Sequence, residues 1–324
     1  MIAVLGAGTW GTALAIVLAK NCPQENILFW GRHNYINYFP DITLPSNIEF
    51  TTDLFAVIKQ SSDLLITVPS SGFSDLIDQI KPYIDLKQHR ISWATKGMDA
   101  VTNKFFSQIV TDLLGEDLPI AVLSGPSFAK EVIHGLPTAV VVACHEKDQL
   151  FANDLIKKLN CKTFRVYINN DLIGVQLGGV FKNVLAVATG ICDGLGFGAN
   201  TRAALITRGL AEVLRLADKL GAKSQTLMGL SGVGDIFLTC SDNQSRNRRF
   251  GMLLATGITI EQAKIEIGQA IEALNNIETL YRLAMYHKID MPIVVSTWQI
   301  LHQEISLRQA VEDLLIRDPQ VEYI

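Results

Sequence analysis

Six residues near the amino terminus, Gly-Ala-Gly-Thr-Trp-Gly at 6–11, constrain the fold of this 324-residue chain more than any other segment. They follow an apolar, strand-like run, Ile2–Leu5, and lead into a helix-compatible stretch, Gly11–Asn21. Glycines spaced in this way between a strand and a helix are typical of the first turn of a parallel sheet, because they let strand, turn and helix approach closely. The sequence therefore predicts an α/β fold for the amino-terminal part of the chain.

Short apolar runs continue to alternate with helix-compatible stretches through the first half of the chain. The runs are continuously apolar rather than alternating, which favours a parallel sheet covered on both faces. Further strands are predicted at Ile27–Trp30, Leu64–Val68, Ile91–Ala94, Ile120–Leu123, Thr138–Ala143 and near Lys162–Tyr167, and further helices at Phe73–Ile80 and Asn103–Leu114. We predict a Rossmann-type doubly wound sheet over residues 1–170.

The second half of the chain has a different pattern. From about Asp171 onward, strand-like runs disappear and helical periodicity dominates. Amphipathic helices are predicted at Thr201–Leu220 and Glu272–His287, and a third at Pro292–Gln303, where proline suits the first turn. We predict an all-helical domain over residues 171–324, whose apolar helices could form a homodimer interface or simply a core.

Composition excludes several classes of protein. A net charge of -4 gives no global basic signal for nucleic acid or for an anionic membrane. The five cysteines are odd in number and not closely paired, which favours reduced cytosolic thiols, and the six histidines show no metal-ligand spacing. A strand directly after Met1 leaves no room for a signal peptide, and no apolar run approaches the ~20 residues that span a bilayer. We expect a cytoplasmic protein without a metal, membrane insertion or a nucleic-acid partner.

The glycine-rich turn predicts a dinucleotide site. Gly6 permits the tight turn, Gly8 lets a pyrophosphate approach the backbone, and Gly11 lets helix and strand pack closely. The phosphates would then meet free amides at the helix N-terminus. The second strand ends in Phe-Trp-Gly-Arg-His at 29–33, without the carboxylate that usually binds the ribose of NAD. Arg32 can pair with a 2′-phosphate, which favours NADPH over NADH, unless it is only a surface arginine.

Lys182 is the only charge in the helical stretch Gly-Gly-Val-Phe-Lys-Asn-Val-Leu-Ala-Val-Ala at 178–188. The positions three and four residues away hold Gly178, Gly179, Leu185 and Ala186. A solvated helix face would carry polar residues there. Burial disfavours the charged form of a lysine, and a chain rarely carries that cost without a use. We therefore predict a functional lysine, the alternative being a lysine on a solvated face.

Three polar segments follow predicted strands: Val68-Pro69-Ser70, Thr95-Lys96-Gly97 and Ser124-Gly125-Pro126-Ser127-Phe128-Ala129. Ligands in open α/β sheets bind beyond the carboxyl ends of strands, so all three segments point to one crevice. Lys96 could meet a phosphate or a carbonyl oxygen there, or be an ordinary turn lysine.

The helical half adds three more polar segments: Gly232-Val233-Gly234-Asp235, Thr239-Cys240 and Ser245-Arg246-Asn247-Arg248-Arg249. Asp235 could orient or charge-balance a buried lysine. The arginine run is either a solvated helix face or a phosphate grip, since interleaved Ser, Asn and Arg side chains donate several hydrogen bonds.

Taken in order, these motifs resemble the bacterial NAD(P)-dependent glycerol-3-phosphate dehydrogenases, over nearly the whole chain. The matching segments are 6–11, 30–33, 94–97, 124–131, 174–179, 182–183, 193–200, 232–235 and 245–251. The chain departs from the family at 180, where Val180, followed by the bulky Phe181, stands in place of the usual small residue, and after Glu272, where glycine is common and Ala273 stands.

The resemblance implies reversible reduction of dihydroxyacetone phosphate to sn-glycerol 3-phosphate by NADPH or NADH, with the product feeding phospholipid synthesis. It implies that Lys182 transfers the proton, aided by Asp235 and Lys96. The implied substrate contacts are Lys96, Gly125, Ser127, Lys182, Asn183, Asp235, Ser245, Arg246 and Asn247. The implied cofactor contacts beside the glycine turn are Thr9, Trp10, Arg32, His33, Lys96, Ala129, Arg246, Ala270 and Glu272.

Two other functions stay open on the residues alone. A related two-domain dehydrogenase could act on a hydroxyacyl thioester or a 2-keto acid. The hydroxyacyl enzymes are expected to use a His–Glu pair in the helical domain, and none follows the glycine-rich stretch. A non-catalytic NAD(P)H sensor could dispense with the lysine or the arginine grip, and this chain keeps both.

Overall fold

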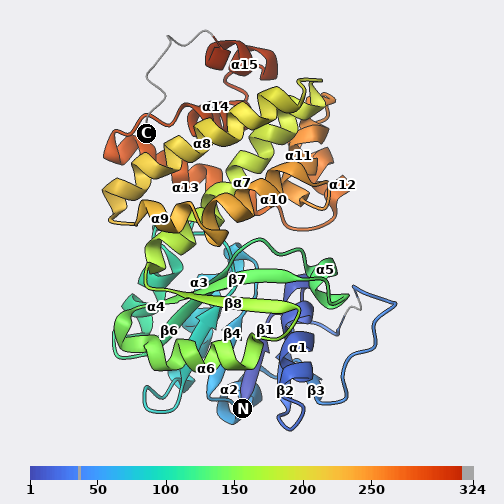
Figure 1. Ribbon diagram of the computed structural model, residues 1–324, viewed down its shortest axis with the longest axis vertical. Helices are drawn as coiled ribbons and strands as arrows, with labels where there is room; N and C mark the ends of the chain where they lie inside the picture. The colour runs from blue at the N-terminus through green and yellow to red at the C-terminus, as the bar shows by residue number, and fades with distance from the viewer. Residues whose placement is uncertain (36–37, 316–324) are drawn as a thin grey trace. The chain divides into compact units, whose positions relative to one another are not determined.

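The computed structural model describes residues 1–35 and 38–315 (Figure 1). The chain forms two compact units. Unit 1 comprises Met1–Asp99 and Lys104–Val175, and unit 2 comprises Ala100–Asn103 and Gln176–Ile324. Residues 316–324 of the predicted second domain lie outside the described residues.

Unit 1 is built on one eight-stranded sheet in the order β3-β2-β1-β4-β5-β6-β7-β8. All neighbouring strands pair in parallel except β6 and β7, which are antiparallel. The strands are β1 (Ile2–Leu5), β2 (Ile27–Trp30), β3 (Ile48–Thr51), β4 (Asp63–Ile66), β5 (Arg90–Trp93), β6 (Ile120–Ser124), β7 (Thr138–Cys144) and β8 (Phe164–Asn169).

Helices cover both faces of this sheet (Figure 1). On one face α1 packs against α5 and α6, and on the other α3 packs against α4. The helices of unit 1 are α1 (Thr9–Asn21), α2 (Leu54–Gln60), α3 (Phe73–Ile80), α4 (Phe106–Leu114), α5 (Ala129–Ile133) and α6 (Gln149–Leu159). The predicted doubly wound α/β class is thus confirmed.

Two details of the predicted sheet were wrong. Strand β3 was not predicted, because it is a half-exposed edge strand whose residues Ile-Glu-Phe-Thr alternate instead of forming an apolar run. The sheet is also mixed rather than parallel, since β7 runs against β6. A short connection, 125–137, joins these two strands and holds only the five-residue helix α5, so β7 returns alongside β6 in the opposite direction.

The strand order places the candidate site at one edge of the sheet. The chain moves outward from β1 to β3, then returns to pair β4 on the other side of β1. The carboxyl ends of β1, β2, β4, β5 and β6 share one edge, because these strands are parallel. The order reverses between β1 and β4, and ligands of doubly wound sheets bind at such a reversal.

Unit 2 is helical throughout the part that the structure describes. Most of α7 (Leu172–Gly194) lies within it and forms its buried centre. The other helices are α8 (Ala199–Leu220), α9 (Ser224–Leu227), α10 (Asp235–Ser241), α11 (Arg246–Ala255), α12 (Ile260–Ile267), α13 (Glu272–His287), α14 (Pro292–Leu301) and α15 (Leu307–Leu315), with a π-helical turn, η4, at Leu230–Gly234.

Helices α7 and α11 meet backbone against backbone along a glycine seam formed by Gly190, Gly194 and Gly251. A Cβ atom on Gly251 would lie only 2.9 Å from the Ile191 nitrogen, and one on Gly190 would overlap the Arg248 carbonyl oxygen. Real Cβ atoms essentially never lie under 3.0 Å from such neighbours. The glycines therefore allow a closer approach than side chains would permit.

The expectation that no apolar run is long enough to span a bilayer was wrong. Helix α7 has 23 residues and a mean hydropathy of 1.5 in its most apolar window, which meets the length and composition of a membrane span. However, 89% of that window is buried inside the fold. The sequence pattern of α7 is that of a core helix, whose apolar residues face other parts of the protein.

Candidate functional site

The glycine-rich turn joins β1 to α1 where the strand order reverses. Gly6 has φ +129°, a conformation that L side chains rarely adopt, and a Cβ there would lie 2.7 Å from the Val68 nitrogen. The Thr67 hydroxyl donates to the Gly6 carbonyl oxygen at 2.8 Å. The turn is therefore packed directly against the end of β4.

The start of α1 can accommodate an anion. Gly8 is the N-cap residue, and no side chain caps this end of the helix. A Cβ on Gly8 would meet nothing within 4 Å, whereas one on Gly11 would overlap the Gly6 carbonyl oxygen. The helix amides thus face open space beside a residue without a side chain, which fits the phosphates of a dinucleotide. Thr9 and Trp10, half-buried, form the first residues of the helix.

The segment after β2 carries an arginine where an acidic residue usually stands. Arg32 and His33 are both exposed, and residues 31–35 include no carboxylate. The Arg32 guanidinium lies near Gly72, since a Cβ on Gly72 would be 3.6 Å from Arg32 Nη2. At this edge of unit 1 the Arg32 guanidinium can attract a bound phosphate, and residues 31–35 contain no carboxylate that would repel it.

Lys96, Gly125 and Ser127 are joined by hydrogen bonds. Lys96 Nζ donates to the Gly125 carbonyl oxygen at 2.9 Å, and Ser127 Oγ donates to the same oxygen at 3.1 Å. Gly125 has φ +135°, and a Cβ there would lie 2.9 Å from the Val140 Cα. Ala129 begins α5 just beyond. The structure thus brings two predicted strand-end segments together at one edge of the sheet.

Lys182 is the cationic member of a buried polar cluster in unit 2. Its Nζ donates to Asp235 Oδ1 at 3.0 Å and to Thr239 Oγ1 at 3.1 Å. The Thr239 hydroxyl also lies 3.3 Å from Asp235 Oδ1. The Lys182 side chain is 14% exposed and that of Asp235 only 1%. An amine held by a carboxylate and a hydroxyl in this way has a fixed position and a small opening to its surroundings.

Helix α10 explains why Asp235 and Thr239 act together. It starts at Asp235, directly after the π-helical turn η4, and residues four apart lie on the same helix face. Asp235 was predicted as a partner for the lysine, whereas no role was predicted for Thr239. Thr239 stands four residues after Asp235, which places both side chains on one helix face. This spacing is the signal that could have predicted Thr239 as a second partner of the lysine.

A second buried cluster links three helices of unit 2. Asn247 Nδ2 on α11 donates to Asn183 Oδ1 on α7 at 2.8 Å. Asn247 Oδ1 accepts from the Ala273 nitrogen in the first turn of α13, at 3.3 Å. Ser245 caps α11, because its hydroxyl accepts from the Arg248 nitrogen at 3.2 Å. The predicted residues Asn183, Ser245 and Asn247 are therefore held in fixed positions around α7.

Arg246 lies nearer the surface than its neighbours. Its Nη1 donates to Gln269 Oε1 at 2.8 Å, an interaction that sequence analysis did not predict. Ala270 is exposed, and Glu272 begins α13. The bond between Arg246 and Gln269 links the start of α11 to the segment before α13.

The departures from the family pattern are accommodated in the core. Val180, Phe181 and Ala273 are each fully buried. The Val180 carbonyl oxygen accepts from Asn276 Nδ2 at 3.4 Å. Val180 and Phe181 lie in α7 and Ala273 lies in α13, so all three are buried within helices that carry candidate site residues.

The predicted site residues fall into two groups, one in each unit. Unit 1 contains Gly6, Gly8, Thr9, Trp10, Gly11, Arg32, His33, Lys96, Gly125, Ser127 and Ala129, and unit 2 contains Lys182, Asn183, Asp235, Ser245, Arg246, Asn247, Ala270 and Glu272.

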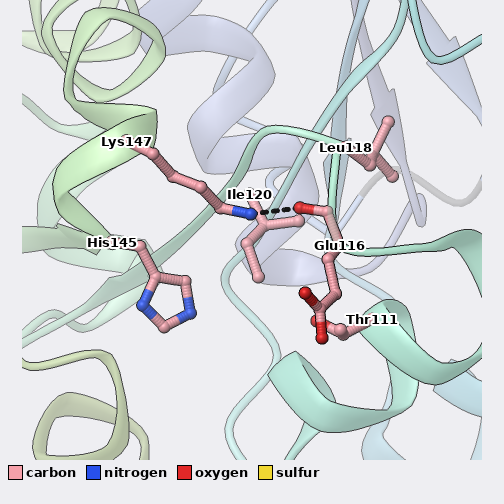
Figure 2. Close-up of a pocket in the computed structure, with 6 residues that line it drawn as sticks. All are labelled: Thr111, Glu116, Leu118, Ile120, His145 and Lys147. Carbon is pink, nitrogen blue, oxygen red and sulfur yellow. Dashed lines mark hydrogen bonds between the residues drawn. The ribbon is translucent and has the colours of Figure 1, made fainter.

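An open pocket of about 340 Å³ in unit 1 lies elsewhere (Figure 2). It is lined by Thr111, Glu116, Leu118, Ile120, His145 and Lys147, and Lys147 Nζ donates to the Glu116 carbonyl oxygen. Ile120 is the first residue of β6, so the pocket lies at the sheet edge opposite Gly125. It contains none of the predicted site residues.

Comparison with known proteins identifies both halves of the chain. Residues 1–150 match the model of the NAD-dependent glycerol-3-phosphate dehydrogenase N-terminus, and residues 171–312 match that of the C-terminus. The chain is 48% identical to "Glycerol-3-phosphate dehydrogenase [NAD(P)+]" of Haemophilus ducreyi, over 99% of this chain and 98% of the relative. It is 47% identical to the protein of the same name from Colwellia psychrerythraea, over 99% and 98%.

Solved structures show the same fold. A crystal structure of glycerol-3-phosphate dehydrogenase from Coxiella burnetii superposes with a TM-score of 0.92 at 45% identity, covering 98% of each chain. The glycerol-3-phosphate dehydrogenase of Saccharomyces cerevisiae superposes with a TM-score of 0.84 at 25% identity, covering 98% of this chain and 99% of the other. The chain therefore belongs to the NAD-dependent glycerol-3-phosphate dehydrogenase family.

Proposed function

We propose that this protein is an enzyme that reversibly reduces dihydroxyacetone phosphate to sn-glycerol 3-phosphate with NADPH or NADH. The relatives named glycerol-3-phosphate dehydrogenase [NAD(P)+] align with this chain over 98% of their own length. The observation that carries the proposal is Lys182, a lysine in the central helix α7 held by Asp235 and Thr239. A buried, oriented amine suits proton transfer to a carbonyl oxygen.

Residues 1–170 act as the dinucleotide-binding domain and residues 171–324 as the helical substrate-binding domain. The open position at Gly8 and the uncapped start of α1 support a pyrophosphate site in the first domain. The proposed cofactor contacts are Gly6, Gly8, Thr9, Trp10, Gly11, Arg32, His33, Lys96, Ala129, Arg246, Ala270 and Glu272. When bound, the reduced nicotinamide supplies the hydride that adds to the C2 carbonyl carbon.

Lys182 performs the proton transfer. As C2 gains the hydride, negative charge grows on its oxygen, and Lys182 Nζ donates the proton that makes this oxygen a hydroxyl. In the reverse direction the same amine removes the hydroxyl proton. General acid–base catalysis of this kind contributes about 10²- to 10⁴-fold. Asp235 and Thr239 hold the amine in place, and the charge of Lys96 favours the developing oxyanion.

The substrate phosphate is held by hydrogen-bond donors. Arg246 provides a planar fork that suits a phosphate, and Ser245, Asn247 and Asn183 surround the same end of α11. Gly125 and Ser127 add contacts from the first domain. Fixing the phosphate also fixes C2, and positioning of this kind lowers the entropic part of the barrier.

Arg32 gives the enzyme a preference for NADPH. The arginine is exposed at the end of β2, where a carboxylate would repel a 2′-phosphate. Its guanidinium can donate two hydrogen bonds to that phosphate, with His33 beside it.

The product supplies glycerophospholipid synthesis, and the enzyme works in the cytoplasm, without nucleic acid and without insertion into a membrane. The odd, unpaired cysteines support a reducing compartment. The burial of α7 supports a water-soluble fold.

The test is an assay of the purified protein with NADPH or NADH. We expect cofactor oxidation with dihydroxyacetone phosphate, and none with acetoacetyl-CoA or ketopantoate at matched concentrations. Oxidation with either of the latter, and not with the triose phosphate, would contradict the proposed substrate. No oxidation with any of the three would leave only a binding function.

A further inference from the structure

Three charged side chains meet at the end of α7, away from Lys182. Asp193 lies in the last turn of α7, Arg202 in the first turn of α8, and Arg248 in the first turn of α11. Arg202 Nη1 contacts both Asp193 oxygens, at 2.9 and 3.1 Å. Arg248 binds Asp193 Oδ2 through Nη2 and through Nε, the latter at 3.1 Å. One carboxylate thus joins three helices.

The pair of Asp193 and Arg248 is enclosed. Their side chains are 9% and 8% exposed, whereas that of Arg202 is 27% exposed. The remaining guanidinium nitrogen of Arg248, Nη1, donates to Asn243 Oδ1 and lies 3.3 Å from the Met252 sulfur. The Arg248 guanidinium is thus already bonded to Asp193 and Asn243 and contacts Met252. We therefore assign Arg248 to packing inside the protein and not to ligand binding.

Each of these charges occupies the unfavourable end of its own helix. An anion is disfavoured at a helix C-terminus and a cation in the first turn, because of the helix dipole. Asp193 has the first arrangement, and Arg202 and Arg248 have the second. Local helix preference therefore does not explain these residues, and such conflicts are expected where function imposes a demand.

The pair fixes the segment that carries the proposed phosphate grip. Arg246 and Asn247 immediately precede Arg248 in the first turn of α11. Asn247 attaches this turn to α7 through Asn183, and Arg248 attaches it a second time through Asp193. The ion pair adds to the bond from Asn247 to Ala273 and to the close approach of Gly190 to the Arg248 main chain, and together these attachments restrict rotation of the turn about the helix axis.

We propose that Asp193 and Arg248 are positioning residues for substrate binding: their ion pair holds the first turn of α11 so that Arg246 and Asn247 grip the substrate phosphate. They act through α11 and touch neither substrate nor cofactor. This inference rests on the proposed reduction of dihydroxyacetone phosphate.

The test compares a phosphorylated and an unphosphorylated substrate in three variants. Asp193→Asn should lower kcat/KM for dihydroxyacetone phosphate by roughly 10- to 100-fold, mainly through KM. The much slower reduction of dihydroxyacetone, which has no phosphate, should change by less than about twofold, since the grip is not used. Arg249→Met removes an exposed arginine from the same run and is the matched control, with both activities expected to be unchanged.

The double variant Asp193→Asn/Arg248→Met separates positioning from stability. The single variant leaves a buried arginine without its carboxylate, whereas the double variant removes both charges and should recover most of the lost thermal stability. A positioning role predicts that the double variant recovers stability and not kcat/KM for the phosphorylated substrate. Recovery of both would reduce the pair to a structural role and overturn the inference.

The two failures are distinguishable. A wild-type protein that does not reduce dihydroxyacetone phosphate removes the proposed function, and the inference with it. A wild-type protein that is active, with an equally active Asp193→Asn variant, removes the inference alone. Equal losses for both substrates would also overturn it, because a phosphate-specific role cannot affect dihydroxyacetone.

Discussion

Lys182 Nζ lies 3.0 Å from Asp235 Oδ1, inside a cluster where the carboxylate is almost completely excluded from solvent. The pairing has two consequences that mutation can separate. The lysine can supply a proton, and its charge also compensates a carboxylate that would otherwise be buried alone.

Substituting Lys182 should therefore give different results for Met and Arg. Lys182→Met should lower kcat by about 10²- to 10⁴-fold and lower the unfolding free energy by about 3 kcal/mol, because Asp235 loses its cation. Lys182→Arg keeps the charge and should keep most of the stability, yet lose kcat, because a guanidinium does not release its proton. Steady-state kinetics with denaturant unfolding checks both. Wild-type kcat in the arginine variant would rule out proton transfer by this residue.

The glycine-rich turn offers a pair of alanine substitutions with opposite expectations. Gly8→Ala places a methyl group in open space at φ −83°, so the fold should remain intact while KM for the cofactor rises about tenfold or more. Gly11→Ala drives a methyl group into the Gly6 carbonyl oxygen and should lower the melting temperature. Unchanged cofactor binding in a folded Gly8→Ala protein, measured by fluorescence titration, would place the pyrophosphate elsewhere.

The proposed preference for NADPH over NADH depends on Arg32. Arg32→Ala should lower kcat/KM for NADPH about tenfold and leave that for NADH within about twofold, since only NADPH carries the 2′-phosphate. His145→Ala, at the opposite sheet edge, is the control and should change neither value. A parallel loss with both cofactors would show that Arg32 does not read the 2′-phosphate.

Glu212 on α8 makes stability depend on pH. Its carboxylate is fully buried and accepts from the Ile293 and Val294 nitrogens at the start of α14, at 2.7 and 3.3 Å. Burial raises the pKa of Glu212 to about 8, against 4.5 for an ordinary glutamate, and the two N–H donors oppose that rise. The folded protein thus holds a proton that the unfolded chain releases. This contribution is fully present below pH 4.5 and is lost as the pH rises through about 8.

Glu212→Gln should remove that dependence. The variant keeps an acceptor for α14 and carries no charge, so its unfolding free energy should gain on that of the wild type between pH 5 and about 8, by up to about 1.4 kcal/mol per pH unit, and the difference should level off at higher pH. Urea unfolding at several pH values measures the difference. A constant difference across this range would mean that Glu212 does not titrate on unfolding.

Local patterns identified most of the fold. Strands β1 and β2 and helices α3 and α13 have the bounds that their apolar runs and periodicity predict. The direction of β7 was not accessible in the same way, because Thr-Ala-Val-Val-Val-Ala-Cys reads the same in a parallel or an antiparallel pair. Direction depends on the connection before β7 and on the partner that it meets, both of which are properties of the tertiary structure.

The candidate site shows the same division. Lys182 could be recognised because a single charge in the apolar stretch 178–188 is improbable without a use, and Asp235 because it directly follows the glycine-rich segment Gly232-Val233-Gly234. The bond from Arg246 to Gln269 and the bond from Asn247 to Asn183 join distant parts of the chain, and no spacing rule connects them. Likewise, Asp193 and Arg248 each look like an ordinary surface charge until the two helices are placed together.

The glycine seam between α7 and α11 has a consequence for how this enzyme could change its substrate. Side chains between helices act as adjustable spacers, and successive small replacements can widen or tilt an interface. Along this seam Gly190 and Gly251 meet main-chain atoms directly, and Gly194 lies against the Ala255 methyl group and the Met252 main chain, so an added methyl group would have to displace a helix. A change in substrate size would therefore have to arise without moving the lysine-bearing helix away from α11.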